Sequence, residues 1–182
     1  MDGYVVIFDL EATCEKNVKL ENSEIIEIGA VRLTPDLEIE STFNQFIKPV
    51  IHPKLSDFCT ALTTIVQEDV DSAFEYSSAM DSFSNWLDRF PRSVLYSWGY
   101  YDKNQIIKES KFKNYSGSIL NHLENHKNLK TQFLEKYKIK GKSGMKFALE
   151  YLGLPLKGKH HRGIDDALNL SEIYKKMVNE SK

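Results

Sequence analysis

The chain has 182 residues, of which 41% are hydrophobic and 27% charged, and its formal net charge is −2. These values are typical of one soluble globular domain, which we expect to span residues 1–182 with a core of about 3–178. No apolar run approaches the roughly 20 residues of a membrane-spanning helix, so we expect no membrane partner. The chain begins without a basic secretory region, and Cys14 and Cys59 are too distant in sequence for a metal-type pair. We therefore expect a cytoplasmic protein with reduced thiols.

The charges are divided unevenly between the two halves of the chain. Residues 1–91 carry 17 acidic and 6 basic side chains, whereas residues 92–182 carry 9 acidic and 18 basic ones. The basic excess peaks between Lys127 and Lys146, where seven lysines accompany one acid, Glu135. Such a run is either a solvated helical face or a surface that follows a phosphate backbone, and the sequence leaves both readings open.

The first part of the chain predicts three strands and one hairpin. Apolar, β-branched runs predict strands at Tyr4–Phe8 and Ser23–Leu33. Leu37–Ile47 alternates between apolar and polar residues, as a half-buried strand does. The short turn Thr34–Asp36 separates the second strand from the third, so these two should form a hairpin.

Strand and helix patterns alternate through the rest of the chain. Apolar residues recur at helical spacing over Ala73–Phe90, and we expect them, Phe74 included, to lie in the core. A fourth strand is predicted at Ser93–Ser97, and Tyr115–Lys127 is polar enough to be a long loop. Further helices are predicted from near Asp57 and over Tyr101–Ser110, Leu129–Tyr137, Ser143–Leu152 and Asp165–Val178.

This order of elements predicts the fold class. An opening hairpin followed by alternating strands and helices indicates an α/β domain with a mixed β-sheet flanked by α-helices. A fifth strand is not visible in the sequence.

Two acidic residues, Asp9 and Glu11, follow directly on the first predicted strand. Side chains at positions i and i+2 of a strand share one face, so both carboxylates should point the same way. On a strand this apolar they would form half of a site for a hard divalent cation. In the alternative reading, the strand ends at Asp9 and both acids are simply solvated.

Asp102 is the second candidate, at the end of the segment SWGYYD. It follows a predicted strand and falls at the strand end or in the first turn of the next helix. From there its carboxylate could meet those of a neighbouring strand. Taken alone, it would more often be an acid that binds the free N–H groups of a helix start.

The third candidate segment is HHRGIDDALN, which begins at His160. His161 lies five residues before Asp166, and a flexible loop over Lys157–Gly163 would let both face one cleft. Asp165 and Asp166 together suit a helix start, and we expect Asp165 to be the cap.

The combination of these residues is more specific than any part of it. Carboxylates of Asp9, Glu11, Asp102 and Asp166 could hold two Mg²⁺ ions, the arrangement that clamps both oxygens in phosphodiester cleavage. His161 could take the proton of the attacking water near neutral pH, because the pKa of histidine lies close to that range.

These segments resemble a known family. FDLEAT, SWGYYD and HRGIDD are similar to the three signature segments of the DEDDh 3′→5′ exonucleases, which share the RNase H-like (DnaQ-like exonuclease) fold. The match gives Asp9, Glu11, Asp102 and Asp166 the four acidic positions and His161 the general-base position. FDLEATC, SEIIEIGAV, LSDFCTALTTI and GIDDALN resemble the ERI-like and KapD-like branch most closely.

The resemblance implies a function and a set of binding residues. It implies hydrolysis of RNA or DNA from the 3′ end to nucleoside 5′-monophosphates, with two Mg²⁺ or Mn²⁺ as cofactors. The expected partners are nucleic-acid 3′ ends, single-stranded or with short overhangs, and no oligomeric state is implied. The backbone around Ala12 and Thr13 would hold the terminal nucleotide, and Leu62 and Thr63 would pack against the terminal bases.

One residue departs from the family pattern. The segment that ends at Ile65 commonly carries glycine before its final isoleucine, where this chain has Thr64. A residue with a Cβ there could change how closely that segment approaches the substrate. We also expect no added nucleic-acid-binding domain, so that the catalytic domain and its lysines would bind the substrate.

Parts of the sequence are also compatible with two alternative functions. FDLEAT also resembles the nucleophile loop of haloacid-dehalogenase-type phosphatases, in which Asp9 would attack phosphate. That reading requires a second aspartate where this chain has Glu11, and it leaves His161 without a role. A non-catalytic nucleic-acid-binding or partner-binding module on the same fold is the other alternative. The presence of all five site residues argues against it.

Overall fold

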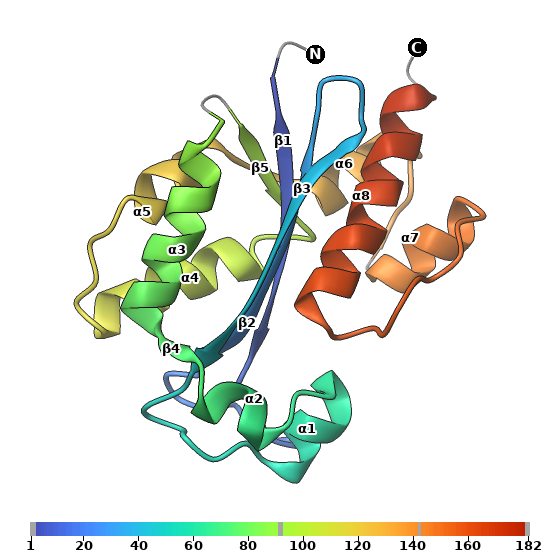
Figure 1. Cartoon of the computed structure of the whole chain (residues 1–182). Helices are drawn as coiled ribbons and strands as arrows, with labels where there is room; N and C mark the ends of the chain where they lie inside the picture. Colours follow the sequence, from blue (N-terminus) through green and yellow to red (C-terminus); the bar gives the residue numbers. More distant parts are fainter. Residues whose placement is uncertain (1–2, 91–92, 142, 181–182) are drawn as a thin grey trace.

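A mixed six-stranded sheet forms the centre of the protein, with helices on both of its faces (Figure 1). The computed structural model describes residues 3–90, 93–141 and 143–180. The strand order is β4-β3-β2-β1-β5-β6. The strands are β1 (Val5–Ala12), β2 (Ile25–Leu33), β3 (Ile39–Lys48), β4 (Phe74–Glu75), β5 (Val94–Ser97) and β6 (His126–Asn128). The predicted α/β class with a mixed, helix-flanked sheet is confirmed.

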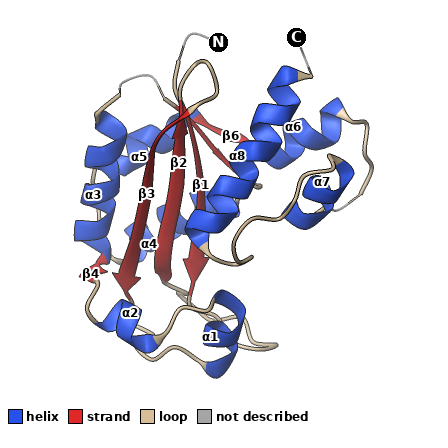
Figure 2. Ribbon diagram, turned by 45° about the vertical axis from the view of Figure 1, so that its right-hand side comes forward, coloured by secondary structure: helices blue, strands red, loops and turns tan. Residues whose placement is uncertain are grey.

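The helices divide into two layers and a small cap (Figure 2). Helices α3, α4 and α5 cover one face of the sheet, α6, α7 and α8 cover the other, and α1 and α2 lie at one end of it. No helix of the described residues is both long and apolar enough to cross a membrane. The helices are α1 (Asp57–Thr63), α2 (Gln67–Asp71), α3 (Tyr76–Asp88), α4 (Tyr101–Phe112), α5 (Ile119–His122), the 3-10 turn η1 (Leu123–Asn125), α6 (Leu129–Lys136), α7 (Met145–Tyr151) and α8 (Gly163–Asn179).

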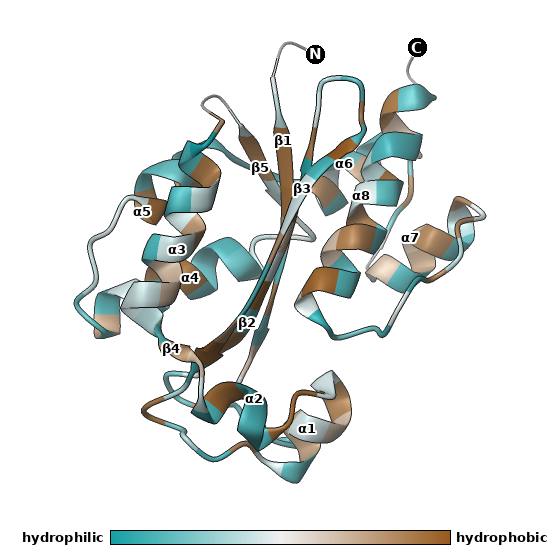
Figure 3. Cartoon of the chain, viewed as in Figure 1, coloured by the Kyte–Doolittle hydropathy of each residue, from teal (hydrophilic) through white to brown (hydrophobic). Residues whose placement is uncertain are grey.

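The alternation of β1 decides which helical layer each of its side chains meets. Val6 and Phe8 pack in the core formed with α3 and α5, whereas Val5 and Ile7 pack in the core formed with α8. The ribbon of the inner strand β1 is coloured mainly as hydrophobic in Figure 3. Because alternate residues share a face, Asp9 and Glu11 project toward α8. The order of residues in this strand therefore aims both carboxylates at the last helix.

The strand β1 is longer than the sequence pattern indicated. The prediction placed its end at Phe8, but pairing with β2 continues through Asp9 and Glu11 to Ala12, with a register shift after Glu11. The reading in which the strand ends at Asp9 is therefore wrong. The predicted hairpin is confirmed, because β2 and β3 pair antiparallel.

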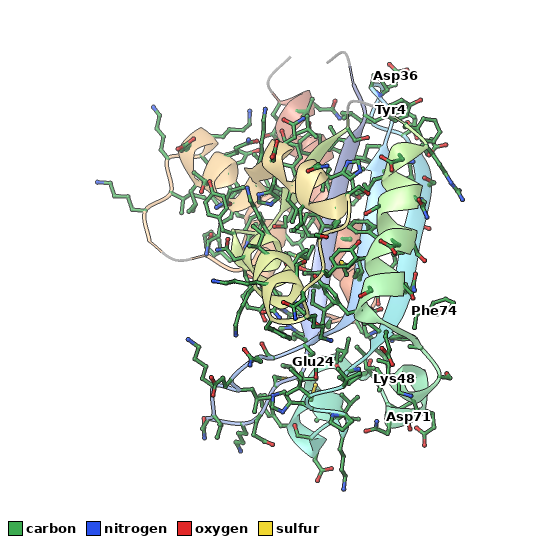
Figure 4. The ribbon with its side chains drawn as sticks, turned by 90° about the vertical axis from the view of Figure 1, so that its left-hand side faces the viewer. Tyr4, Glu24, Asp36, Lys48, Asp71 and Phe74 are labelled. Carbon is green, nitrogen blue, oxygen red and sulfur yellow. The ribbon has the colours of Figure 1, made fainter. Side chains whose placement is uncertain are left out.

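Two short strands were missed by the sequence pattern. The predicted loop Tyr115–Lys127 contains α5, η1 and the start of β6, which pairs in parallel with β5. The predicted helix Ala73–Phe90 begins only at Tyr76, because Phe74–Glu75 form β4 beside the end of β3. Phe74 was expected in the core, but it is 62% exposed at the outer edge of the sheet (Figure 4). Strands of two or three residues are too short for a period to show.

Candidate active site

A cleft at the carboxyl end of β1 brings the five sequence-predicted site residues together. The cavity has a volume of about 350 Å³. Its lining includes Asp9, Glu11, Asp102, His161 and Asp166, together with His160, Trp98, Tyr101, Leu10, Gly144, Met145 and Leu170. The ends of β1 and β5, the starts of α4, α7 and α8 and the histidine loop meet here, so residues that are far apart in the sequence share one small volume.

Three of the acids form a close group. Oxygens of Asp9, Glu11 and Asp166 all lie within 4.8 Å of one another. Asp166 reaches them because α8 starts directly against β2, at the point where Gly29 pairs with Asp9. A Cβ on Gly29 would lie 2.0 Å from the backbone carbon of Gly163, so only glycine allows this approach. The role of Gly29 is not visible in the sequence.

Asp102 lines the same cleft from the first turn of α4. Its Oδ1 accepts a hydrogen bond from the backbone N–H of Leu10 at 3.3 Å. Its side chain is buried, with 4% of the residue exposed. Asp102 therefore meets the β1 carboxylates, as predicted, but it does so from outside the close group of three.

Burial and repulsion raise the pKa of the acids in this cleft. Burial, followed by repulsion from Asp102, Glu11 and Asp166, raises the pKa of Asp9 well above its ordinary value. Burial and then Asp166 raise the pKa of Glu11 to about 8, and burial raises that of Asp102 to about 6. The pKa of Asp166 is raised by burial as well. Carboxylates crowded in this way favour a cation among them.

Both histidines of the HH pair approach Asp166. The Nδ1 atom of His160 lies 2.9 Å from one oxygen of Asp166 and 3.2 Å from the other. The backbone N–H of His161 donates to the same carboxylate at 3.1 Å, and the two rings stack with centroids 3.9 Å apart. Burial, followed by the neighbouring His160, lowers the pKa of His161, which favours the neutral ring that a general base requires. The contact of His160 with Asp166 was not predicted.

The histidine loop is held in place by hydrogen bonds, although its glycines predicted a flexible segment. The backbone of Lys157 exchanges two hydrogen bonds with the side-chain amide of Asn169, at 2.9 and 2.8 Å. The backbone N–H of Lys159 donates to Asp165 at 2.8 Å. Asp165 was expected to cap α8, but the helix begins at Gly163 with Arg162 in the capping position. Asp165 instead ties the loop to the helix.

The expected nucleotide-binding residues lie at the end of β1 and in α1. The backbone N–H of Thr13 donates to the backbone carbonyl of Glu24 at 2.8 Å, and the Thr63 hydroxyl is buried and donates to the Cys59 carbonyl at 2.9 Å. Ala12 and Leu62 are half-buried. A second cavity of about 470 Å³ is lined by Thr13 and, like the first, by Tyr101. The two cavities therefore adjoin at Tyr101.

Thr64 lies at the end of α1 in a left-handed conformation, with φ of +62°. Its hydroxyl is buried without a hydrogen-bond partner among the described residues. Left-handed backbone at a helix end favours glycine, because a Cβ crowds the following carbonyl. This geometry gives a physical reason why glycine would suit this position.

Comparison with known proteins identifies the family. An exonuclease family profile (RNase_T) matches residues 6–174. The human 3′-5′ exoribonuclease 1 is 30% identical over 97% of this chain, and the chain covers 53% of that protein. The mouse ERI1 exoribonuclease 3 is 31% identical over 96% of the chain, again with 53% of the relative covered. The chain thus spans about half the length of these curated relatives.

Solved structures agree with this assignment. The nuclease domain of 3′hExo, described as a DEDDh family member bound to rAMP, superposes with a TM-score of 0.87 at 28% identity, covering 98% of this chain and 92% of that one. Exonuclease I superposes with a TM-score of 0.73 at 11% identity and shares the fold. The superposition covers 98% of this chain and 41% of the exonuclease I chain. Neither the fold nor any of these matches supports the phosphatase alternative. The chain belongs to the exonuclease family and groups with its DEDDh members.

Proposed function

We propose that the protein is a metal-dependent 3′→5′ exonuclease that releases nucleoside 5′-monophosphates from nucleic-acid 3′ ends. The observation that carries this proposal is the convergence of Asp9, Glu11, Asp102, His161 and Asp166 on one cleft. Carboxylates that close to one another suit hydrolysis of a phosphodiester, in which negative charge must be neutralised on both sides of the phosphorus. Relatives named 3′-5′ exoribonucleases support the same reaction.

We assign two Mg²⁺ or Mn²⁺ ions to the acidic part of the cleft. The close oxygens of Asp9, Glu11 and Asp166 are hard ligands of the kind that both ions prefer, and Asp102 adds a fourth carboxylate beside them. Burial raises the pKa values of these acids, and mutual repulsion adds to this at Asp9 and Glu11. A bound cation would relieve that repulsion, so the residues fit the group. When bound, the ions would supply charge neutralisation and polarise the scissile phosphate.

His161 is assigned the general base. Its ring lines the cleft, its pKa is lowered, and its backbone is bonded to Asp166. A neutral ring in this position accepts the proton of the attacking water near neutral pH. His160, which contacts Asp166 through its side chain, holds that carboxylate in place and is the second candidate for the base.

We propose that the terminal nucleotide occupies the space around Tyr101. The adjoining cavity lined by Thr13 supports a place for a base or ribose there. The backbone at Ala12 and Thr13 would hold the nucleotide, whereas Thr63 is buried and would act only by supporting the position of Leu62. RNA is the favoured substrate class because the similar proteins include 3′-5′ exoribonucleases and a 3′-exonuclease that recognises a histone mRNA stem-loop.

We assign the lysine-rich segment Lys127–Lys146 to binding the part of the nucleic-acid substrate that extends out of the cleft. Gly144 and Met145 line the cleft itself, and Trp98 of its wall donates to the Ser143 carbonyl at 3.4 Å. Lys138, Lys140 and Lys146 of this segment are exposed. Exposed lysines at the mouth of an acidic cleft would attract phosphates. The two free cysteines favour a cytoplasmic location.

The direct test is digestion of a 5′-labelled oligonucleotide. With Mg²⁺ or Mn²⁺ we expect a ladder of shortening products and release of 5′-mononucleotides, both abolished by EDTA. Matched single-stranded and duplex RNA and DNA, digested in parallel, would rank the substrates. A substrate that is bound but stays intact under every metal condition would contradict the proposal and favour the non-catalytic alternative.

A further inference from the structure

Glu27 is a buried carboxylate on β2 that has no role in the proposed chemistry. Its Oε2 accepts from Nε of Arg162 at 3.1 Å and from the backbone N–H of Gly163 at 2.9 Å. Its Oε1 accepts from Nη2 of Arg162 at 3.1 Å. Two parallel bonds between a guanidinium and a carboxylate set both distance and orientation. The Arg162 guanidinium also lies over the ring of Phe46, 5.2 Å from its centroid.

This pair differs from the other contacts of the histidine loop. The bonds of Lys157, Lys159 and His161 all run to side chains of α8, so they hold the loop to that helix. Among the hydrogen bonds of the described residues, the bonds to Glu27 are those that join the loop and the start of α8 to a side chain of the sheet. They therefore decide where the histidines stand relative to the strands.

The register of the sheet places this anchor directly beside the acids. Glu27 of β2 is paired with Glu11 of β1, and Gly29 is paired with Asp9. Because neighbouring strands lie about 5 Å apart, a group bonded to Glu27 is held within one strand spacing of the β1 carboxylates. The bond from Arg162 thus sets the separation between the histidine turn and Glu11.

We propose that Arg162 is a positioning residue, whose paired bonds to Glu27 hold the His160–His161 turn at its working distance from Asp9 and Glu11. The inference rests on the general-base role proposed for His161. Misplacement of a catalytic group by about 1 Å can cost about 100-fold in rate. Arg162 would act on turnover through this geometry without touching the substrate.

An alternative role for Arg162, charge balance, would have different measurable effects. Arg162 could serve only to balance the charge of Glu27, which otherwise repels Asp9 and Glu11. Its loss would then change the affinity for the metal and leave the loop in place. Measuring metal binding and loop protection separately distinguishes the two roles.

The test uses Arg162→Ala and Arg162→Lys in the full chain, with Arg89→Ala as the matched control. Arg89 is exposed at the far end of α3 and faces no part of the cleft. For Arg162→Ala we expect kcat to fall about 10- to 100-fold, with KM and the affinity for Mn²⁺ changed less than about twofold. The kcat of Arg162→Lys should lie between those of Arg162→Ala and the wild type, because an ammonium group cannot form the same two parallel bonds to Glu27. The control should match the wild type.

Hydrogen exchange gives a readout that does not require catalysis. Backbone amides of residues 157–163 should exchange at least about tenfold faster in Arg162→Ala than in the wild type. Glu27→Gln should show the same loss of protection from exchange. Adding it to Arg162→Ala should lower kcat little further, because both substitutions break the same contact. If Glu27→Gln does not fold, the two Arg162 variants carry the test alone.

The outcomes separate the failure of this inference from that of the proposed function. Unchanged kcat and unchanged exchange in Arg162→Ala would overturn the positioning role. So would altered Mn²⁺ affinity with unchanged exchange, which would assign Arg162 to charge balance. A wild-type protein without exonuclease activity would instead refute the proposed function, while the exchange data would still decide whether Arg162 holds the loop.

Discussion

The backbone N–H of Leu10 donates to the carboxylate of Asp102 at 3.3 Å, so the third acid is bonded to the strand between the first two. Pairing of β1 with β5 extends only from Val5 to Ile7. Among the described residues β1 has no pairing with β5 beyond Ile7, and α4 begins there with Asp102 in its first turn. The early end of β5 is therefore what admits a carboxylate to the site.

Asp9→Asn tests whether the close acids hold the metal. The change removes a ligand and also removes a charge that its neighbours repel. We expect activity to fall more than about 100-fold, while the melting temperature of the metal-free protein at pH 8 rises. The increase in melting temperature that Mg²⁺ gives the wild type should disappear. A variant that is less active but still stabilised by Mg²⁺ to the same extent would contradict the assignment.

His161→Ala tests the general base. We expect turnover to fall roughly 10²- to 10⁴-fold, the usual contribution of such a group, while Mg²⁺ binding persists because His161 is not assigned as a ligand. His160→Ala is the comparison, since that ring neighbours His161 and contacts Asp166. Normal turnover in His161→Ala together with a large loss in His160→Ala would transfer the role to His160.

The stability of the metal-free protein should depend on pH through the crowded acids. The pKa of Glu11 is raised to about 8 and that of Asp102 to about 6. Between the ordinary values and these, the folded state binds more protons than the unfolded state, so stability falls as pH rises from about 5 to 8. With EDTA present we expect the melting temperature to drop by about 5 °C or more over this range.

Two controls accompany this measurement. Glu11→Gln should flatten the pH dependence, because the neutral amide does not titrate. Saturating Mg²⁺ should stabilise the protein more at pH 8 than at pH 5, since a cation binds the deprotonated acids. A pH dependence between pH 5 and 8 that Glu11→Gln leaves unchanged would contradict the raised pKa of Glu11.

Thr64→Gly tests the strained end of α1. The left-handed backbone at φ +62° costs a residue with a Cβ about 1–2 kcal/mol, part of which is offset by the freedom of glycine in the unfolded chain. We expect the free energy of unfolding to rise by about 1 kcal/mol in urea titrations. Thr60→Gly, in the body of the same helix, should destabilise the protein instead. Equal changes in the free energy of unfolding for Thr64→Gly and Thr60→Gly would contradict backbone strain at Thr64.

The lysine-rich segment is tested by salt dependence. Lys138, Lys140 and Lys146 are exposed, and replacing all three with alanine should raise KM for an oligonucleotide several-fold at low salt. The slope of log KM against log salt should become shallower, because fewer counterions are released. Lys111→Ala, at the end of α4, is the control. An unchanged slope in the triple variant would assign these lysines to a solvated helical face.

Much of the fold follows from short-range patterns. The alternation of Val5 to Ile7, continued by Asp9 and Glu11, determines that both acids share a face, whatever lies opposite. The spacing of apolar residues in the last helix likewise determines its buried side, from Leu170 to Met177. Such patterns are visible in sequence because neighbouring residues obey the period of their own element. Together with the resemblance of three segments to the DEDDh signature, they indicated all five candidate site residues.

Contacts between distant segments were decided by the tertiary structure alone. The approach of Asp166 to Asp9 depends on Gly29 meeting Gly163, and the place of the histidine turn depends on Glu27 meeting Arg162, 135 residues away. Nothing in the local period of either segment specifies its partner. The short strand β6 exists because β5 offers it an edge. The sequence by itself thus determined which side chains could act, and packing across the sheet decided their distances.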